Sequence, residues 1–493
     1  MSENQAITIS DLMESSGVKF GTSGARGLAD DMTDQICYAY TLAFLQYLLE
    51  VGDIKKADQV AIAGDFRSST PRIMDAVGKA VSDAGCEPVN CGFIPTPAVA
   101  CFAMARNIAS IMVTGSHIPD DRNGIKFYKP AGEILKDDEQ ALCARKVHIP
   151  VGLFDHQSFP LPAEQTDAYR EYVKRYLDFF PAGCLQGLKV GIYEHSSVDR
   201  DILGEVIAGL GAEIVCLGRS KAFIPVDTEA IRPEDVVLAR KWSKEHGLDC
   251  LVSTDGDGDR PLVSDEHGQW LRGDVAGILC AHYLGSTHVV TPVSSNSAVE
   301  KSGWFDQVDR TRIGSPFVIA AMNTAVAEGQ TNVVGYEANG GFLTATDIEM
   351  DGRTLTALPT RDAVIVPLAI LMLAKSFNST VSELLTQLPQ RFTSSDRLKA
   401  FPTELSREKL APLDGEDADG NRRAAEAILG SVFGEVLSID NTDGVRITFN
   451  NGEVAHLRPS GNAPELRCYN EADSEDRAAE MNRLCLEILA SWR

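Results

Sequence analysis

Short apolar runs alternate with longer amphipathic segments over most of the chain. The short runs predict buried strands, at 58–64, 87–92, 108–113, 188–192, 213–217, 248–253, 288–293 and 332–335. The longer segments predict helices, at 34–51, 71–84, 96–106, 137–147, 163–180, 199–210, 232–246, 275–284, 316–327 and 362–373. Strands that alternate with helices in this way indicate parallel βαβ units, and therefore an α/β fold.

The pattern changes after about residue 385. An acidic, glycine-containing stretch at 410–422 predicts an exposed loop or linker. Two strands at 445–449 and 454–457 flank an Asn-Asn-Gly turn, a loop at 458–464 leads to a strand at 465–469, and a terminal helix follows at 474–491. We therefore predict four domains, at 1–162, 163–267, 268–384 and 385–493, of which the last is a small α+β domain.

The charge of the chain limits its partners. The 493 residues carry 46 Lys and Arg against 70 Asp and Glu, which gives a net charge of −24. Such a surface repels nucleic acid and anionic membranes, so we expect neither as a partner. An anionic substrate would require a local cationic pocket.

Cysteine usage and apolar segments predict the compartment. The 11 cysteines are odd in number, include no C-x-x-C pair and fall partly inside apolar runs, which is typical of free thiols in a reducing compartment. The first residues lack the basic and apolar parts of a signal peptide. The longest apolar stretch, 36–49, is too short to span a bilayer. We expect a cytoplasmic protein.

Ser116 follows the apolar strand 108–113 directly, in a loop rich in Gly, Pro, Asp and Asn. A serine at the C-terminal end of a strand lies where open α/β sheets carry their chemistry. The alternative is a hydroxyl that only hydrogen-bonds its own turn. The Ser-His hydrolase alternative has little support, since the chain lacks a G-x-S-x-G motif here and His117 is directly adjacent in sequence.

Three aspartates alternate with glycines at Asp255, Asp257 and Asp259. Carboxylates this close repel one another unless a cation gathers them, and oxygen ligands suit Mg²⁺ or Ca²⁺. An EF-hand is excluded because Arg260 stands where that loop needs glycine. A catalytic Mg²⁺ site is the main prediction, with a structural metal or a solvated acidic turn as alternatives.

Three further loops carry polar side chains between glycines. Arg26 lies between the small residues Ala25 and Gly27, so its guanidinium could reach across a cleft. Glu337 and Asn339 could bind a polyol, and the 458–467 segment is rich in hydrogen-bond donors that suit a phosphate. Each loop has a simpler explanation, namely a surface turn, an exposed glutamate and a hairpin end with a surface arginine.

Together these loops resemble those of the α-D-phosphohexomutase family, which comprises phosphomannomutases and phosphoglucomutases. The matching stretches are Phe20-Gly-Thr-Ser-Gly-Ala-Arg-Gly27, Thr114-Gly-Ser-His-Ile-Pro119 with Asn123-Gly-Ile-Lys126, Asp255-Gly-Asp-Gly-Asp-Arg260, Gly335-Tyr-Glu-Ala-Asn-Gly-Gly341 and Arg458-Pro-Ser-Gly-Asn-Ala-Pro464. They follow the family's order over nearly the whole chain. The resemblance implies three related α/β domains, with mixed sheets sandwiched by helices, and a C-terminal α+β domain around a central cleft.

The resemblance also implies roles for individual residues. Ser116 would carry a phosphoryl group and, with Asp255, Asp257 and Asp259, would hold one Mg²⁺. The catalytic groups around the phosphoryl would be Arg26, Lys126, Arg260 and His117, with Lys126 as a candidate proton carrier. Sugar hydroxyls would meet Glu337, Asn339 and the Gly314 loop. The distal phosphate would meet Arg458, Ser460, Gly461, Asn462 and Arg467, and their domain would close as a lid.

The expected activity is transfer of a phosphoryl group between O6 and O1 of a hexose, through a hexose 1,6-bisphosphate. Phosphomannomutase is the first expectation; phosphoglucomutase, phosphoglucosamine mutase, a phosphatase and an inactive sugar-phosphate-binding relative are the alternatives. The chain departs from the family pattern at Gly115, Ile118, Asn462-Ala463, Gly314-Ser315 and Asn339-Gly-Gly, which leaves the acid/base group and the preferred sugar open. We expect a hexose phosphate as the small-molecule partner, a hexose 1,6-bisphosphate as activator and intermediate, and a monomer or dimer.

Overall fold

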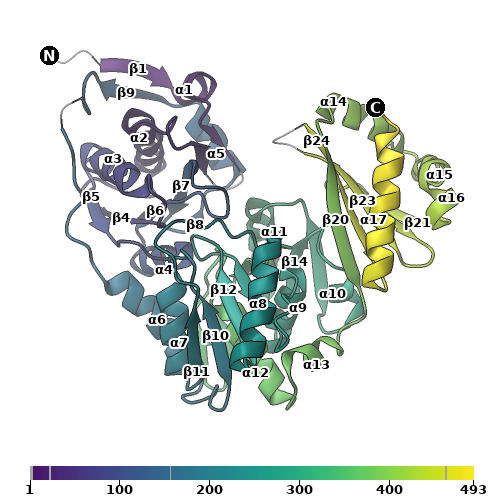
Figure 1. Ribbon diagram of the computed structural model, residues 1–493. Coiled ribbons are helices and arrows are strands. Elements are labelled where there is room, and N and C mark those ends of the chain that lie inside the picture. Colours follow the sequence, from purple (N-terminus) through teal and green to yellow (C-terminus); the bar gives the residue numbers. More distant parts are fainter. Residues whose placement is uncertain (1–3, 22–23, 156, 461–463) are drawn as a thin grey trace.

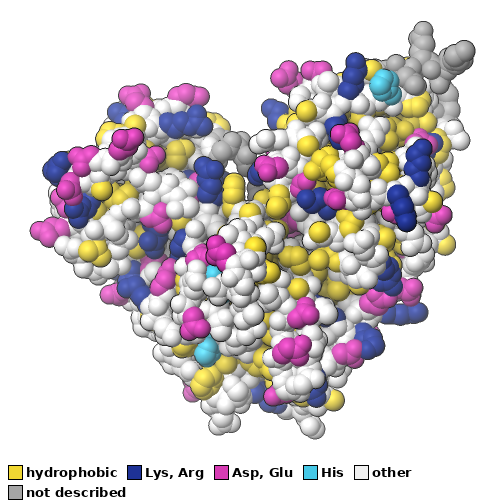
Figure 2. All heavy atoms as spheres, turned by 180° about the vertical axis from the view of Figure 1, so that it is seen from behind, with side chains coloured by type: hydrophobic (Ala, Val, Ile, Leu, Met, Phe, Trp, Pro, Cys, Tyr) yellow, Lys and Arg dark blue, Asp and Glu magenta, His cyan; other side chains and the backbone are white. Residues whose placement is uncertain are grey.

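The structure is a computed structural model that describes residues 4–21, 24–155, 157–460 and 464–493. The four larger sheets with their helices form four bodies along the chain, arranged as a V (Figure 1). The first body and the last body form the two upper ends of the V, and the second and third lie below them. The space-filling view from behind shows the same two upper lobes (Figure 2).

The first sheet has seven strands. They are β2 (Lys19–Phe20), β3 (Ala25–Leu28), β7 (Arg122–Lys129), β6 (Ala109–Val113), β4 (Gln59–Gly64) and β5 (Glu87–Asn90) in spatial order, with β8 (Gly132–Glu133) paired to β7. Strands β4, β5 and β6 run parallel, whereas β7 is antiparallel to β6. The helices of this body are α1 (Ile9–Ser16), α2 (Asp34–Val51), α3 (Thr70–Asp83), α4 (Thr96–Arg106) and α5 (Lys136–Cys143).

The second and third sheets repeat one strand order. The second contains β11 (Glu213–Leu217), β10 (Lys189–Tyr193), β12 (Cys250–Thr254) and β13 (Pro261–Val263), and the third contains β15 (Gln307–Thr311), β14 (His288–Pro292), β16 (Val333–Tyr336) and β17 (Phe342–Thr344). In each, three parallel strands are followed by one antiparallel strand. The order β5-β4-β6-β7 in the first sheet is the same, so the three α/β domains are related and their sheets are mixed.

This shared order has a direct consequence for the predicted motifs. The Ser116 loop joins β6 to β7, the Asp255 loop joins β12 to β13, and the Glu337 loop joins β16 to β17. Each motif therefore occupies the same topological position in its own domain, between the last parallel strand and the antiparallel strand. Ligands of open α/β sheets bind at the carboxyl ends of parallel strands.

Helices and a short hairpin complete the second and third domains. The helices are α6 (Asp167–Phe179), α7 (Arg200–Gly209), α8 (Pro233–His246), α9 (Gly273–Tyr283), α10 (Ala298–Lys301), α11 (Ser315–Ala327), α12 (Ile365–Ser376) and α13 (Val381–Leu385). The hairpin is β18 (Ile348–Met350) with β19 (Arg353–Leu355). One apolar core joins side chains from the first three domains, including Ala98, Ile202 and Leu368.

The fourth domain is an antiparallel sheet with helices and has an apolar core of its own, around Leu457 and Met481. Its strands in spatial order are β20 (Phe392–Lys399), β24 (Glu465–Ala472), β23 (Val454–Pro459), β22 (Val445–Phe449) and β21 (Val436–Asp440). Its helices are α14 (Thr403–Leu410), α15 (Ala418–Ala425), α16 (Ser431–Phe433) and α17 (Glu475–Ala490), with single turns at Ala411–Leu413 and Glu426–Gly430. The α+β prediction is confirmed.

Three local predictions were wrong. The 410–422 segment is not a linker, because Leu413 is buried and most of the segment lies in helical turns. The helix predicted at 137–147 ends at Cys143, since Lys146–Pro150 forms strand β9 against β1 (Asn4–Thr8). The loop after Ser116 is shorter than its Gly, Pro, Asp and Asn residues predict, because Asn123 and Gly124 belong to strand β7.

Two observations bear on the predicted compartment. No described helix is long and apolar enough to cross a membrane. All 11 cysteines are free thiols. The cytoplasmic location and the oligomeric state stay predictions, as do the boundaries of the four domains.

Candidate active site

Ser116 meets the predicted metal loop directly. Its hydroxyl donates to Asp255 Oδ2 at 2.5 Å, although the two residues are 139 positions apart. Its backbone adopts a left-handed conformation with φ of 56°, and its N–H donates to Thr114 Oγ1 at 2.7 Å. Such a conformation is costly for a residue with a side chain and is typical of functional sites. The fold therefore presents this hydroxyl to the aspartates.

A buried arginine fixes the serine loop. Arg67 donates through its two terminal nitrogens to the carbonyl oxygens of Ser116, Ile118, Pro119 and Arg122, at 2.5 to 3.0 Å. Its Nε lies 3.1 Å from Asp65 Oδ2, and both side chains are inaccessible. The sequence analysis did not identify Arg67, because no sequence pattern indicates that a residue at the end of β4 contacts a loop some 50 residues later.

The three aspartates form one buried cluster. Oxygen atoms of Asp255, Asp257 and Asp259 lie within 4.8 Å of one another. Within the described chain, Asp257 Oδ1 and Asp259 Oδ1 accept no hydrogen bond. Burial, together with the two neighbouring carboxylates, raises the pKa of Asp255 well above its ordinary value. A buried all-oxygen donor set with free lone pairs fits a hard divalent cation.

Two cations already face this cluster. Lys126 Nζ lies 2.6 Å from Asp257 Oδ2 and 2.6 Å from Asp259 Oδ2. Although burial opposes ionisation of Asp257, Lys126 holds the pKa of that carboxyl below its ordinary value. Arg361 Nη2 lies 3.0 Å from Asp259 Oδ2. The sequence analysis identified Lys126 but missed Arg361, which precedes α12 and belongs to none of the five motifs.

His117 and Arg260 lie beside the serine. Arg260 Nη1 is 2.9 Å from His117 Nδ1, which is 3.3 Å from Ser116 Oγ. Because a guanidinium can only donate, Nδ1 is the acceptor and a neutral imidazole carries its proton on Nε2. Burial, and then Arg260, lowers the pKa of His117 to about 3. His117 is therefore neutral near pH 7.

Arg26 approaches the same centre from β3, opposite Gly124 of β7. Its side chain is half-buried. Burial, and then Arg260, lowers the pKa of Arg26 to about 10, which still leaves it charged at neutral pH. The structure thus gathers Arg26, Lys126, Arg260 and Arg361 around Ser116 and the aspartates, and creates a local cationic site in an acidic protein.

The sugar loop lies next to this centre. Glu337 is 4% exposed, so the exposed-turn explanation is wrong, and its Oε2 is 3.3 Å from Arg361 Nη1. Asn339 Oδ1 accepts from Gly341 N at 2.9 Å. Gly314 has φ of 130°, and the next residue, Ser315, places its hydroxyl 3.2 Å from Glu133 Oε1 of the first domain. Arg361 joins this loop to the aspartate cluster.

The predicted phosphate loop lies on the fourth domain. Arg458 Nε is 2.9 Å from Asp443 Oδ1, and Asp443 Oδ2 accepts from Ile313 N of the third domain at 3.0 Å. Ser460 is buried, and its N–H donates to Glu465 O at 2.8 Å. Gly461 and Asn462 lie outside the described residues. Arg458 therefore sits where the third and fourth domains meet.

A pocket of about 330 Å³ lies between the side chains next to Ser116 and the fourth domain. His117 and Arg260 line it from the first and second domains, and Arg397, Arg467 and Tyr469 line it from the fourth. Ser116 is 1% exposed and is not among the lining residues. The pocket thus reaches the side chains that cover the serine, and carries arginines on both sides.

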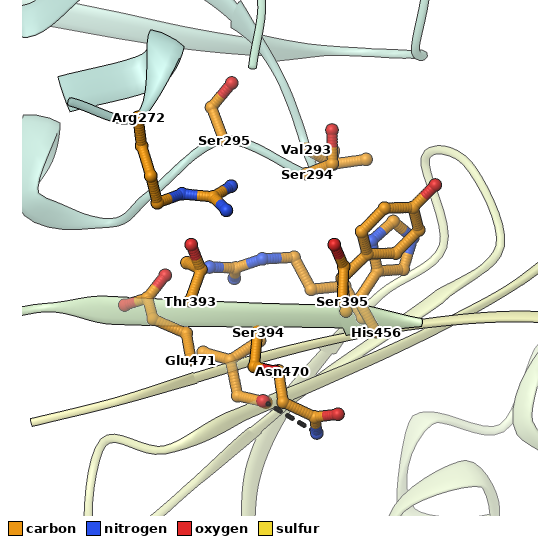
Figure 3. Close-up of a pocket in the computed structure, with 13 residues that line it drawn as sticks. Arg272, Val293, Ser294, Ser295, Thr393, Ser394, Ser395, His456, Asn470 and Glu471 are labelled. Atoms are coloured by element: carbon orange, nitrogen blue, oxygen red, sulfur yellow. Dashed lines mark hydrogen bonds between the residues drawn. The ribbon is translucent and has the colours of Figure 1, made fainter. Parts of the chain in front are cut away.

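A second, small pocket marks the seam between the third and fourth domains (Figure 3). Arg272 and Ser295 face strand β20 across it, where Thr393 is placed. Beside it, Glu471 binds Arg391 at 2.6 Å and accepts from Ser297 N at 3.0 Å. This seam is polar, in keeping with the separate core of the fourth domain.

Comparison with known proteins agrees with this geometry. Four successive segments match "Phosphoglucomutase/phosphomannomutase" domain families: residues 17–148 match alpha/beta/alpha domain I, 167–268 domain II, 272–392 domain III and 408–486 the C-terminal domain.

Two relatives share more than two fifths of their residues with this chain. A phosphomannomutase of Salmonella muenchen is 43% identical over 483 residues, which cover 98% of this chain and 97% of the relative. A phosphomannomutase of Sinorhizobium fredii is 42% identical, with 96% of this chain and 99% of the relative covered. A crystal structure of a phosphoglucomutase/phosphomannomutase family protein from Burkholderia thailandensis has the same fold, with a TM-score of 0.72 at 20% identity, and covers 99% of this chain and 98% of its own. With all four domains matched in order and the five predicted loops present, the chain belongs to the phosphoglucomutase/phosphomannomutase family of α-D-phosphohexomutases.

Proposed function

We propose that the protein is a phosphomannomutase, which interconverts mannose 6-phosphate and mannose 1-phosphate through a phosphorylated Ser116. The observation that carries the proposal is the 2.5 Å contact between the Ser116 hydroxyl and Asp255, inside a cluster of carboxylates and cations. The choice of mannose is supported by the names of the relatives from Salmonella muenchen and Sinorhizobium fredii, which are 43% and 42% identical to this chain.

The residues fit a bound Mg²⁺. Asp255, Asp257 and Asp259 would hold it together with a phosphoryl oxygen on Ser116, because oxygens of the three carboxylates converge, one each of Asp257 and Asp259 accepts no hydrogen bond, and hard oxygen ligands suit this ion. The ion would neutralise charge on the transferring phosphoryl group.

The first transfer moves the phosphoryl group from the protein to the sugar. A sugar hydroxyl oxygen forms a bond to phosphorus, and the bond from phosphorus to Ser116 Oγ breaks. The hydroxyl proton leaves the sugar, and Ser116 Oγ ends protonated, with Lys126 as our candidate carrier. Arg26, Arg260 and neutral His117 stabilise and orient the phosphoryl group. Catalysis of this type depends on positioning and on charge neutralisation.

The second transfer requires the hexose 1,6-bisphosphate to turn around within the pocket, so that its other phosphate returns to Ser116. Glu337, Asn339 and the Gly314 loop bind ring hydroxyls. The proposed distal-phosphate group is Arg458, Ser460, Arg467 and, by the motif alone, Gly461 and Asn462. Because the first two domains and the fourth domain both contribute side chains to the pocket, the fourth domain can close over the sugar.

A coupled assay tests the substrate. Mannose 1-phosphate, glucose 1-phosphate and glucosamine 1-phosphate are each supplied with Mg²⁺ and a trace of the matching 1,6-bisphosphate. We expect the highest kcat/KM with mannose 1-phosphate. Intact mass should show one phosphoryl group on the wild-type protein after treatment with the bisphosphate, and none on Ser116→Ala. Inorganic phosphate as the main product would contradict the mutase proposal.

A further inference from the structure

The connection between β11 and α8 is unusually long. Residues 218–232 form no helix or strand, and none of the five motifs includes them. Irregular connections of this length within a compact domain are uncommon, and those that are ordered usually serve binding or catalysis. The function of this connection therefore needs an explanation.

The connection is built onto the active site. The Phe223 ring lies 4.0 Å from the guanidinium carbon of Arg67, the residue that holds the serine loop. A Cβ added to Gly256, in the metal loop, would lie 2.9 Å from the same ring. Farther along, Thr228 Oγ1 donates to the carbonyl oxygen of Asn339, in the sugar loop, at 2.6 Å. The 218–232 segment thus contacts three of the five motif loops or their supports.

Asp227 is oriented by its own turn. Its Oδ1 accepts from Glu229 N at 2.9 Å and from Ala230 N at 3.2 Å. Both hydrogen bonds that Asp227 accepts from described residues are made by Oδ1, and none is made by Oδ2. Asp227 lines the 330 Å³ pocket together with His117 and Arg260. One carboxylate oxygen is therefore anchored, and the other is available to a ligand.

The charge of Asp227 limits what that ligand group can be. A carboxylate repels a phosphate dianion but accepts a hydrogen bond from a hydroxyl group. In a pocket whose arginines serve the phosphates, a fixed acceptor suits the neutral ring between them. We propose that Asp227 is a specificity-determining residue that accepts a hydrogen bond from a ring hydroxyl of the bound hexose, an inference that rests on the proposed mutase function.

Asp227→Asn is the most informative variant. The asparagine Oδ1 still accepts from the two backbone N–H groups, whereas the ionised acceptor on the second atom is lost. We expect kcat/KM for the preferred hexose 1-phosphate to fall about 10- to 100-fold, as for a lost hydrogen bond to a charged group. The matched control is Glu234→Gln, an exposed carboxylate on α8 outside the pocket, with kcat/KM unchanged.

Deoxy analogues identify the contact. Wild type and Asp227→Asn are compared on hexose 1-phosphates that each lack one of the hydroxyls at C2, C3 or C4. For the analogue that lacks the partner hydroxyl, the two proteins should have the same kcat/KM. For the other analogues the 10- to 100-fold difference should persist.

Three outcomes separate the possible explanations. If Asp227→Asn loses the same factor on every analogue, Asp227 only positions Arg260 and His117, and the inference is wrong. If the variant matches wild type on the full substrate, the inference is also wrong. If wild-type Ser116 takes no phosphoryl group from the 1,6-bisphosphate, it is the proposed function that fails, and the intact mass shows this independently of Asp227.

Discussion

The guanidinium of Arg67 lies 2.8 Å from the backbone carbonyl oxygen of Ser116. The same side chain binds the carbonyl oxygens of Ile118, Pro119 and Arg122 and the buried carboxylate of Asp65. The position of Ser116 therefore depends on a buried cation at the end of the neighbouring strand β4.

Arg67→Met should destabilise the protein and inactivate it. The change leaves Asp65 buried without its ion-pair partner, which costs about 3–5 kcal/mol when one member of a buried pair is removed. Chemical denaturation measures the loss in the free energy of unfolding. Arg423→Met, which removes an exposed arginine 3.4 Å from Asp417, is the control and should change stability by less than about 0.5 kcal/mol. Equal stability of the two variants would disprove the role of Arg67.

Gly24→Ala should impair activity through a backbone clash. Gly24 has φ of 122°, and a Cβ there would lie 2.1 Å from Ile125 O of β7, next to Lys126. The strand that carries Arg26 would have to move away from β7. Gly52→Ala has the same left-handed strain, with φ of 83°, but no atom within 4 Å. We expect a loss of kcat/KM of at least tenfold for Gly24→Ala alone, measured with the coupled assay; similar values for both variants would contradict the clash.

Mg²⁺ should raise the thermal stability of the wild-type protein. An ion that binds only the folded state at 100 times its Kd adds about 2.7 kcal/mol to the free energy of unfolding. Asp257→Asn should lose most of this increase, because it removes one carboxylate of the cluster. Differential scanning calorimetry with and without Mg²⁺ provides the measurement. An Mg²⁺-dependent rise in Tm that survives in the variant would argue against the proposed site.

Stability should fall as the pH is lowered from 6.5 towards 4. Burial lowers the pKa of His195 to about 4 and that of His456 to about 4. In this pH range the unfolded chain binds protons at these histidines, while the folded protein does not. Each histidine therefore lowers the free energy of unfolding by about 1.4 kcal/mol for each unit by which the pH falls.

His195→Gln should reduce this pH dependence. The glutamine amide could still donate to the Thr254 carbonyl oxygen, which His195 Nε2 contacts at 2.8 Å. Urea unfolding at several pH values measures the slope. His148→Gln, at an exposed position, is the control and should keep the wild-type slope. A slope for His195→Gln equal to that of wild type would contradict the assignment.

Local motifs made much of this site predictable. The apolar run before Ser116 and the glycines between the aspartates specify a strand end and a tight loop, which are short-range features. In the structure, Ser116 Oγ donates a hydrogen bond to Asp255, and Lys126 forms an ion pair with Asp257. These pairings followed from the family resemblance, not from any spacing in the sequence.

Other features depend on contacts that sequence patterns do not record. Arg67 and Arg361 are ordinary charged residues in sequence, and only the packing of distant segments buries them. Asn123 and Gly124 have turn-forming character, yet β7 includes them because β3 and β6 flank that strand on both sides. Leu410 and Leu413 lie in an acidic stretch but pack into the core of the fourth domain, so tertiary packing there overrides composition.

Ser116 is 1% exposed, and His117, which contacts its hydroxyl, lines the neighbouring pocket together with Arg260. A phosphate ester at that position would be shielded from solvent by the same side chains that orient it in the proposed mechanism. If water hydrolysed the phosphoserine of such an enzyme, the serine would have to be phosphorylated again before the next turnover. In the proposed mechanism, this burial would favour the sugar over water as the acceptor and would preserve the phosphorylated form of the protein between turnovers.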